Sequence, residues 1–417
     1  MITLAMNSES RQTMNALHMV TPQGADIGVI RQQPPLRPFS EEALAFVEAL
    51  SKALLRDPRF RPFPELIAFG FWMRRRHVIE LKELFDKQRD GRLWQAHGLI
   101  FHIAPANVDT IFLYSFILSL LVGNANIVRI SSKRNAQMEA IIALLDDLLA
   151  QDAHEAVRRR LAVVRYGHDD AMTAYFSANC DLRVIWGGDE TVSAIRRVPL
   201  PPHARDLVFP DKFSIAVFDA AAVLYADDLD EVARNFANDA YWFGQMACSS
   251  PRIVLWRGAK DACARASDVF WTALEKHAGR VATDLEAADF VNKFVAESGI
   301  SMWRKVKVRL GKNNLINVIR FDDIDDLPIE EHCGAGLFYE VFIPDLNKIP
   351  GLIGRKLQTV ASFGIKAREW ADLLSASPPL GIDRVVPVGE ALTFSPVWDG
   401  HDLLREFCRE ISIGEKL

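Results

Sequence analysis

The sequence predicts an α/β protein with two domains, each built around a parallel sheet. From about Leu99 onward, short runs of β-forming residues alternate with helical stretches. This alternation is typical of a parallel sheet with helices on both faces. A second alternating series begins near residue 219, and 417 residues are enough for two or three separate cores.

The expected strands and helices can be placed along the chain by the spacing of their apolar residues and by the residues that cap helices. The first series has expected strands at Leu99–Ile103, Asn126–Ile130, Leu161–Tyr166, Leu182–Trp186 and Phe213–Phe218. Its expected helices lie near 109–121, 135–150, 169–178 and 189–197, after earlier helices at 40–54 and 66–85. The second series has expected strands near 252–256, 305–310, 315–320, 338–343 and 357–362, and helices near 259–277 and 367–375. The tail is expected to hold a strand at Arg384–Val388 and a short helix at Asp402–Glu410.

These elements predict a division of the chain into segments. Residues 1–60 form an irregular and helical N-terminal segment, 61–218 a first domain, and 219–380 a second domain. Residues 381–417 are expected to pack back on the first domain.

Composition and charge exclude several classes of protein. The net charge is −5 and the pI is about 6.1, so no basic bias favours a nucleic-acid partner. The five cysteines are scattered and form no CxxC pair, which favours a reducing cytoplasm and neither a metal site nor a disulfide framework. The longest apolar run, Ile111–Val122, is too short to span a bilayer, and the polar start lacks the order of a signal peptide.

One cysteine lies in a segment of unusual character. A helix that Asp227 or Asp228 can cap leads into Trp242–Pro251, in which Cys248 is surrounded by small and polar residues just before a proline. A thiol presented on such a loop is a possible nucleophile. The alternative is a buried cysteine that acts as a small apolar side chain.

Two turns follow expected strands of the first series. Ala104-Pro105-Ala106-Asn107 follows the first strand, and Gly187-Gly188-Asp189 follows the fourth and opens a helix. Ligands of parallel sheets bind at the carboxyl ends of the strands, and N–H groups at a helix start can face a phosphate or a ribose. A plain tight turn is the alternative interpretation of the glycine pair.

Five segments, taken in order, resemble the aldehyde dehydrogenase superfamily. They are Ile103–Asn107, Gly123–Ser132, Gly187–Glu190, Gly244–Cys248 and Glu331–Ala335. Within the superfamily the chain is most similar to the acyl-CoA reductase subunit of bacterial bioluminescence fatty-acid reductases. The features that carry this likeness are Ala104-Pro105-x-Asn107, Ala247-Cys248-Ser249-Ser250-Pro251-Arg252, Gly381–Gly389 and Trp398-Asp399-Gly400. The resemblance covers most of residues 60–413.

The resemblance implies an aldehyde-dehydrogenase-like fold, with a Rossmann-type cofactor domain followed by a catalytic domain that carries the cysteine. It implies that Cys248 forms an acyl-enzyme and that the side-chain amide of Asn107 and the N–H of Cys248 form an oxyanion hole. An Asx turn is the alternative role for Asn107. The resemblance further implies NADPH or NADH as cofactor and no metal. The implied cofactor-binding residues are Pro105, Arg129, Ser131, Ser132, Gly187, Gly188 and Glu331. For Glu331, an ordinary surface carboxylate is an equally good interpretation.

Several residues depart from the superfamily pattern. Arg129 replaces the cofactor-binding lysine, which keeps the charge and changes its geometry. Ser132 and Lys133 follow where NAD-selective members often carry a carboxylate, which favours tolerance of a 2′-phosphate. Val208 aligns with the glutamate that activates water, with Asp211 three residues later as a substitute base. Cys333 and Ala335 replace the Phe and Pro of the last segment.

We therefore expect a cytoplasmic acyl-CoA reductase that converts an acyl thioester into an aldehyde. The expected partners are a fatty acyl-CoA or acyl-protein substrate, an acyl-protein synthetase or transferase, and further copies of the chain in a homo-oligomer. Val208 disfavours a hydrolytic aldehyde dehydrogenase, because valine cannot accept a proton. A cysteine-dependent acyltransferase or acyl carrier without redox activity is the rival from another class, and an inactive scaffold is a third.

Overall fold

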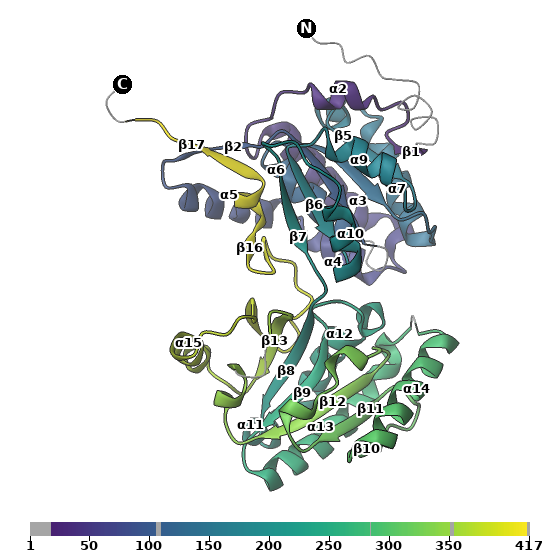
Figure 1. Ribbon diagram of the computed structural model, residues 1–417, viewed down its shortest axis with the longest axis vertical. Coiled ribbons are helices and arrows are strands. Elements are labelled where there is room, and N and C mark those ends of the chain that lie inside the picture. The colour runs from purple at the N-terminus through teal and green to yellow at the C-terminus, as the bar shows by residue number, and fades with distance from the viewer. Residues whose placement is uncertain (1–17, 106–109, 284, 351–353, 415–417) are drawn as a thin grey trace. The chain divides into compact units, whose positions relative to one another are not determined.

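The structure is a computed structural model that describes residues 18–105, 110–283, 285–350 and 354–414. The chain forms two compact units (Figure 1). The first contains Met1–Pro210 and Phe394–Leu417, and the second contains Asp211–Thr393.

The first unit is built on a six-stranded sheet with the order β1-β5-β4-β3-β6-β7. Neighbouring strands from β5 to β7 are parallel, and β1 is antiparallel to β5 at one edge. The strands of this sheet are β1 (His18–Thr21), β3 (Leu99–Ile103), β4 (Ala125–Ile130), β5 (Leu161–Arg165), β6 (Leu182–Trp186) and β7 (Arg205–Phe209). Strand order reverses between β3 and β6, as in doubly wound nucleotide-binding sheets.

Helices cover both faces of this sheet. The helices of the unit are α2 (Ile27–Arg31), α3 (Glu41–Arg56), α4 (Pro64–Trp72), α5 (Arg75–Arg89), α6 (Thr110–Leu121), α7 (Ala136–Leu149), α8 (Glu155–Arg158), α9 (Asp170–Ser177), α10 (Asp189–Arg196) and α16 (Leu403–Glu406). Side chains of α2, α9 and α10 share one apolar cluster with β3, β4, β5 and β6. Helix α6 is buried on every side, between β3 and β4 and the helices α3, α4 and α16, which is why its sequence is apolar all round.

The C-terminal segment returns to the first unit. Strand β17 (Cys408–Ile411) pairs antiparallel with β2 (Leu93–Ala96), after a short hairpin of β15 (Val397–Trp398) and β16 (His401–Asp402). The helix expected at Asp402–Glu410 is therefore only four residues long, because Cys408 and the residues after it are hydrogen-bonded to a distant strand.

The second unit is built on a seven-stranded sheet with the order β10-β11-β12-β9-β8-β13-β14. Every neighbouring pair is parallel except β10 with β11. The strands are β8 (Phe213–Asp219), β9 (Pro251–Arg257), β10 (Lys307–Leu310), β11 (Asn317–Phe321), β12 (Leu337–Ile343), β13 (Leu357–Phe363) and β14 (Arg384–Pro387).

Each face of the second sheet has its own apolar core. Helices α11 (Ala220–Leu224), α12 (Leu229–Tyr241) and α13 (Lys260–Val281) cover the face that carries Phe218, Val254 and Trp256. Helices α14 (Ala287–Trp303) and α15 (Ala367–Ala376) cover the other face. Short 3-10 turns complete the unit, among them η3 (Trp242–Gln245) and η5 (Ile329–Glu331).

The expected boundary between domains differs from the observed one. Phe213–Phe218 was expected in the first sheet, but β8 pairs with β9 and β13 and so belongs to the second. The chain therefore passes from one unit to the other at Pro210, not after residue 218. Likewise β14 pairs with β13, so only the residues from Phe394 onward join the first unit.

The helix expected over 66–85 is also divided. Helix α4 ends at Trp72 and α5 begins at Arg75, because Arg74 is extended with ψ of 143°. The guanidinium of Arg74 lies 3.8 Å from the ring centroid of Phe71, and Arg75 bonds Glu48 across 2.7 Å. The break thus directs Arg74 back onto α4 and Arg75 toward α3.

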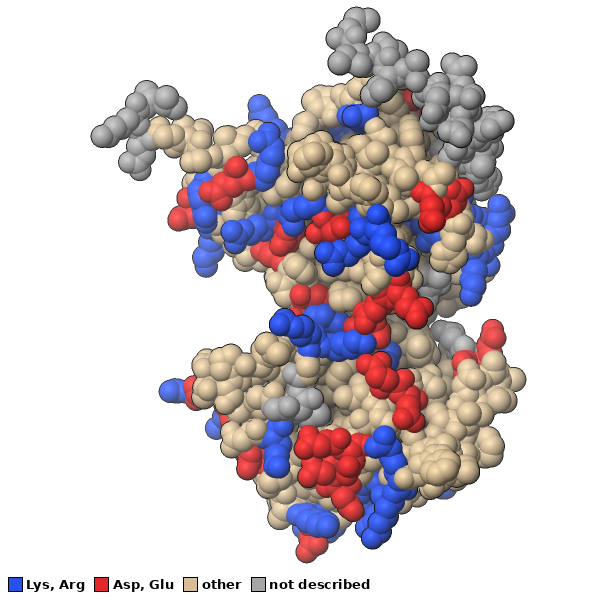
Figure 2. Space-filling model, viewed as in Figure 1, with Lys and Arg blue, Asp and Glu red and all other residues tan. Residues whose placement is uncertain are grey.

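Charged side chains of both signs are interspersed on the face in view of each unit (Figure 2). This distribution agrees with the small net charge of −5. Within the ranges that the structure describes, no helix is long and apolar enough to cross a membrane. Nor does that part of the chain hold three or more His, Cys, Asp or Glu side chains placed to bind one metal ion.

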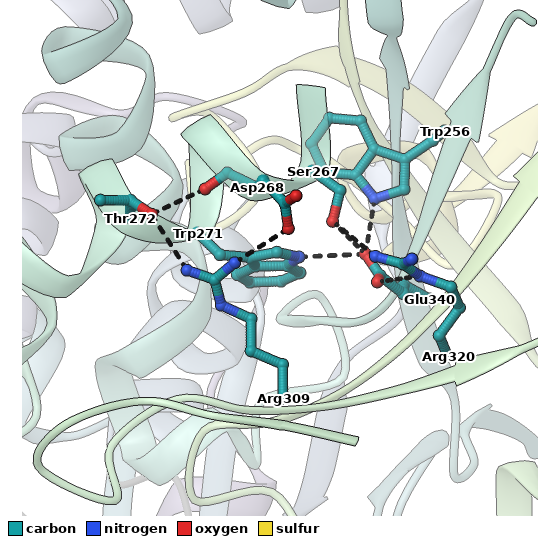
Figure 3. Close-up of polar contacts among 8 residues, drawn as sticks. All are labelled: Trp256, Ser267, Asp268, Trp271, Thr272, Arg309, Arg320 and Glu340. Atoms are coloured by element: carbon teal, nitrogen blue, oxygen red, sulfur yellow. Dashed lines mark hydrogen bonds and ion pairs between the residues drawn. The ribbon is translucent and has the colours of Figure 1, made fainter. Parts of the chain in front are cut away.

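A buried carboxylate joins the second sheet to α13 (Figure 3). The Oε2 atom of Glu340 accepts hydrogen bonds from the Nε1 of Trp256 at 2.9 Å, the Oγ of Ser267 at 2.9 Å and the Nε1 of Trp271 at 3.0 Å. Its Oε1 accepts from the Nε of Arg320 at 2.6 Å. Because the carboxylate side chain is only 2 % exposed, these four hydrogen bonds replace its hydration by water.

We predict that Glu340→Ala lowers the free energy of unfolding of the second unit by about 3–5 kcal/mol, since it removes one member of a buried charge pair. Arg309→Ala is the matched control. Arg309 also bonds the α13 helix, but its partner Asp268 is 70 % exposed, and such pairs contribute at most about 1 kcal/mol. Urea unfolding followed by tryptophan emission measures both variants, and equal losses would contradict the assignment.

Candidate functional site

The loop that carries Cys248 begins with a sharp turn after α12. Phe243, Gly244 and Gln245 have φ of 57°, 59° and 67°, which places three successive residues in the left-handed region. The chain then passes through Cys248 to Pro251, the first residue of β9. The turn therefore ends α12 and places the cysteine at the amino end of a central strand of the sheet.

The Gln245 side chain holds this turn in place. Its Nε2 donates to the carbonyl oxygens of Pro251 at 2.9 Å and Leu337 at 3.1 Å, and its Oε1 accepts from the N–H of Gly336 at 2.8 Å. The N–H of Ala335 donates to the carbonyl of Gly244 at 3.0 Å. Gln245 is buried, so the Gly-Gln pair of the motif is a structural clamp between the cysteine loop and the 334–337 segment.

Cys248 itself is half-buried and lies against strand β13. The Nε2 of Gln358 donates to its Sγ at 3.2 Å, and the Oγ of Ser214 donates to its carbonyl oxygen at 2.7 Å. Both the sulfur and the backbone of the residue are thus held by hydrogen bonds from neighbouring strands.

The other cysteines are in surroundings that disfavour the thiolate. Burial raises the pKa of Cys180 and Cys408 to about 12 and that of Cys263 to about 11. Burial also raises the pKa of the half-buried Cys333. Because a thiolate is the nucleophilic form, these four are poor candidates for covalent chemistry.

A buried lysine supports the segment opposite the cysteine loop. The Nζ of Lys293, on α14, donates to the carbonyl oxygens of Ala335, at 2.8 Å, and of Asn314. Burial lowers the pKa of Lys293 to about 8. The ring of His332 bridges the same segment, since its Nε2 lies 2.8 Å from the carbonyl of Leu337 and its Nδ1 accepts from Gly334.

Glu331 belongs to this second unit, at the end of η5. Its side chain is exposed and lies 4.0 Å from the guanidinium of Arg304. The other six residues expected to bind a cofactor belong to the first unit.

Three of those six residues lie at the point where strand order reverses in the first sheet. Pro105 follows β3, and Gly187 and Gly188 follow β6, the neighbour of β3. Asn107, the expected oxyanion donor, lies outside the described residues. Gly188 is the N-cap of α10 and brings no capping side chain. Asp189 and Glu190 place negative charge in the first turn, which disfavours a phosphate at this end of the helix.

The end of β4 carries the remaining expected cofactor residues. Arg129 donates from its Nε to the carbonyl of Tyr166 at 3.2 Å and from its Nη2 to that of Gly167 at 3.1 Å. Burial lowers its pKa below the ordinary arginine value. Ser131 accepts the N–H of Lys133 at 3.2 Å, and Ser132 and Lys133 are exposed. Arg129 therefore fixes the loop after β5 with two of its donors.

The segment 208–212, in which valine replaces the superfamily base, is divided between the two units. Val208 lies on β7 and packs against the apolar cluster of the first sheet. Asp211 is exposed in the second unit and lies 4.0 Å from the Nζ of Lys356. Lys212 pairs with Asp383 across 2.5 Å.

A buried polar network lies next to the turns after β3 and β6. The Nε2 of His102 lies 2.9 Å from the Oδ1 of Asn126, and its Nδ1 lies 2.8 Å from the Oγ of Ser115. Asn126 donates its own Nδ2 to a carbonyl, so its Oδ1 must accept and the proton of His102 is on Nε2. Ser115 then donates to His102 and accepts from the Nε1 of Trp186, the residue before Gly187, at 3.3 Å.

Sequence reasoning missed Gln358 and the clamp role of Gln245. Gln358 is separated from Cys248 by 110 residues, so no local motif joins them. The available signal was a long amide in the strand Leu357–Phe363, whose other side chains are apolar or carry a small hydroxyl.

The fold is shared with aldehyde dehydrogenases. A Mycobacterium tuberculosis aldehyde dehydrogenase complexed with NAD+ is 12 % identical, with a TM-score of 0.64 over 92 % of this chain and 88 % of that one. An oxidoreductase from Marinobacter aquaeolei is 12 % identical, with a TM-score of 0.68 over 93 % of this chain and 88 % of that one. At this identity the likeness concerns the fold, and it defines an aldehyde-dehydrogenase-like protein with two α/β units.

Sequence comparison is more specific. Residues 76–308 match the family model of the acyl-CoA reductases (LuxC), and the chain belongs to this family. A long-chain acyl-protein thioester reductase from Vibrio harveyi is 27 % identical over 166 residues, which are 39 % of this chain. The matched segment spans 33 % of the length of the Vibrio protein.

We predict that His102 remains neutral in the folded protein at mildly acidic pH, because burial lowers its pKa to about 4. In the unfolded chain it takes up a proton near pH 6.5, so stability falls as the pH drops from about 6.5 toward 4. In urea unfolding, the stability advantage of the wild type over His102→Gln should shrink by about 2–3 kcal/mol between pH 7 and pH 4.5. Parallel pH curves for the two proteins would contradict this account.

Proposed function

We propose that this protein reduces an acyl thioester to an aldehyde through an acyl-enzyme on Cys248. The observation that carries the proposal is the clamped loop, which holds a half-buried thiol in a hydrogen bond at the amino end of β9. Membership of the acyl-CoA reductase family supports the choice of reaction.

In the proposed reaction, the Cys248 thiolate attacks the thioester carbonyl and the thiol of the carrier departs. The backbone N–H of Cys248 and the side-chain amide of Asn107 are proposed to donate hydrogen bonds to the oxyanion. A nicotinamide cofactor, when bound, supplies the hydride for the acyl carbon. The Cys248 thiolate then leaves as the carbonyl of the aldehyde forms.

The first unit fits a nicotinamide cofactor. Its strand order reverses between β3 and β6, and the turns after these two strands hold Pro105 and the glycines Gly187 and Gly188. We propose that these residues bind the cofactor together with Arg129, Ser131, Ser132 and Glu331. The exposed Ser132 and Lys133 support acceptance of a 2′-phosphate, and therefore use of NADPH at least as well as NADH.

Hydrolysis of the acyl-enzyme is the disfavoured outcome. A thioester reacts slowly with water unless a base activates the water, and such help is worth roughly 10²–10⁴-fold. Val208, which aligns with the superfamily base, cannot accept a proton and packs against the core. The missing base supports a reductase over an aldehyde dehydrogenase that releases acids. The glycine turn and the reversed strand order support a reductase over an acyltransferase without redox activity.

We propose a long-chain acyl group, carried either by CoA or by an acyl protein, as substrate. The Vibrio harveyi relative is named for an acyl-protein thioester, which supports the second carrier and an acyl-protein synthetase or transferase as partner. We also propose that the chain works in the reducing cytoplasm, which five free cysteines support.

Assembly into a homo-oligomer is a further part of the proposal. One helix, α14, carries large apolar side chains on its exposed surface: Val291, Phe294, Val295, Met302 and Trp303. A surface of this kind favours contact with another protein surface, and a second copy of the chain would provide one.

We predict that long-chain acyl-CoA forms one covalent adduct on Cys248 and that NADPH then yields the fatty aldehyde. Cys248→Ala should lose the adduct and at least about 10³-fold in rate, because sulfur makes the covalent bond. Cys333→Ala is the matched control, since it removes the other half-buried thiol of the unit. Intact-mass measurement and peptide mapping test both variants, and an adduct that persists in Cys248→Ala would contradict the proposal.

A further inference from the structure

We propose that Gln358 is a further catalytic residue, which stabilises the negative charge on the Cys248 sulfur by donating a hydrogen bond to it. This inference rests on the proposed function, in which that sulfur is first the nucleophile and later the leaving group. Neither the family motifs nor the resemblance of the sequence assigned a role to Gln358.

The contact is direct and buried. The Nε2 of Gln358 lies 3.2 Å from the Sγ of Cys248, within the range of a hydrogen bond to sulfur. Gln358 is only 1 % exposed, so its amide is held away from bulk water. Its backbone is fixed in the sheet, because its carbonyl accepts from the N–H of Asp383 at 2.8 Å.

A second set of hydrogen bonds orients the amide. The Oε1 of Gln358 lies 3.2 Å from the Oγ1 of Thr359, and that Oγ1 accepts from the Nε of Arg384 at 2.9 Å. Because a guanidinium can only donate, the hydroxyl proton of Thr359 is available for the Gln358 oxygen. This arrangement turns the NH₂ group of the amide toward the sulfur.

The same residues also tie the cysteine backbone to β13. The N–H of Thr359 donates to the Oγ of Ser214 at 3.1 Å, and that hydroxyl donates to the Cys248 carbonyl at 2.7 Å. Two routes therefore connect Gln358 and Thr359 to Cys248, one at its sulfur and one at its carbonyl. These contacts from β8 and β13 therefore hold the sulfur in place relative to its donor.

A hydrogen-bond donor at this position acts on the steps in which sulfur carries charge. Before acylation, the thiol proton passes to water and the donor stabilises the thiolate that remains. In acylation, the sulfur lone pair forms the new C–S bond while the bond to the carrier sulfur breaks. After hydride addition, the oxyanion pair re-forms the C=O bond, the bond from carbon to Cys248 breaks, and its electron pair returns to the sulfur. The Gln358 N–H then donates its hydrogen bond to the thiolate that forms.

A neutral amide suits this double role. A cation beside the sulfur would lower the pKa of the thiol further, but the nucleophilicity of a thiolate falls as its pKa falls. A hydrogen bond from a neutral group stabilises the anion without a full opposing charge. Gln358 therefore assists departure of the sulfur while leaving it reactive in attack.

The test is the pH dependence of alkylation of Cys248 by iodoacetamide in the full-length protein, read by peptide mass spectrometry. This reagent reacts with the thiolate, so the midpoint of the rate profile reports its formation without acyl substrate or cofactor. Gln358→Met fills similar space and cannot donate, and it should raise the midpoint by about 1–2 pH units. Gln358→Glu should raise the midpoint at least as much, because a carboxylate repels the thiolate.

Two further variants complete the design. Thr359→Val keeps the amide but removes the hydroxyl that orients it, so a smaller rise is expected. Ser362→Ala is the matched control on β13, since its hydroxyl bonds Trp370 and not the cysteine, and its midpoint should equal that of the wild type. A second readout is the release of aldehyde from the preformed acyl-enzyme, which should slow in Gln358→Met by about tenfold or more.

The measured midpoints decide whether Gln358 stabilises the thiolate. A Gln358→Met midpoint within about 0.3 pH unit of the wild type, or a shift of equal size in Ser362→Ala, would overturn the inference. If Gln358→Met does not fold, the Thr359→Val and Gln358→Glu profiles decide in the same way. A shifted midpoint in a protein that makes no aldehyde would sustain the role of Gln358 at the thiol and refute the proposed reduction.

Discussion

The site depends on the left-handed turn at Phe243, Gly244 and Gln245. Residues other than glycine lose roughly 1–2 kcal/mol in this conformation, so the turn persists only if other contacts hold it. The Gln245 amide provides them, with hydrogen bonds to Pro251 at the far end of the loop and to Gly336 and Leu337 at the start of β12. Without this turn α12 would run on, and Cys248 would not reach the amino end of β9.

This constraint explains how a buried sheet presents the thiol that we propose as the nucleophile. Most of the cysteines are enclosed, and their high pKa values keep them as thiols. Cys248 is held at the end of the sheet, where a partly exposed sulfur can meet a substrate and still contact a fixed donor from β13. Exposure allows the chemistry, and the rigid strands on both sides determine its geometry.

In the first unit, too, buried hydrogen bonds hold strands in place next to the turns of a candidate site. Its parallel strands end together, and the buried network of His102, Ser115 and Trp186 keeps β3 and β6 aligned just before their turns. His102 can do this only as a neutral ring, because a charge there has no carboxylate within the network to pair with it. The turns themselves then contain the small residues that we propose to contact the cofactor.

Much of this structure was predictable from local sequence, and the remainder depends on distant pairings. The spacing of apolar residues predicted the exact bounds of β3 and β6, because buried parallel strands are short apolar runs between helices. The same spacing, with a capping aspartate, predicted the helix that leads to the cysteine. The assignment of β8 to the second sheet was not predictable, since Phe213–Phe218 would suit either sheet and only its pairing with β9 decides. The contact of Gln358 with Cys248 likewise joins residues from strands and loops far apart in the chain. Local patterns predict elements, whereas such contacts follow from strand order.

The central claim is that the acyl group on Cys248 leaves as an aldehyde. The most direct measurement is a single-turnover chase of purified, isotopically labelled acyl-enzyme, freed of CoA and then given NADPH. The account predicts that the label appears as fatty aldehyde, with one cofactor oxidised for each label released. Release of the label as free carboxylic acid, or its retention on the protein while NADPH is unchanged, would contradict it.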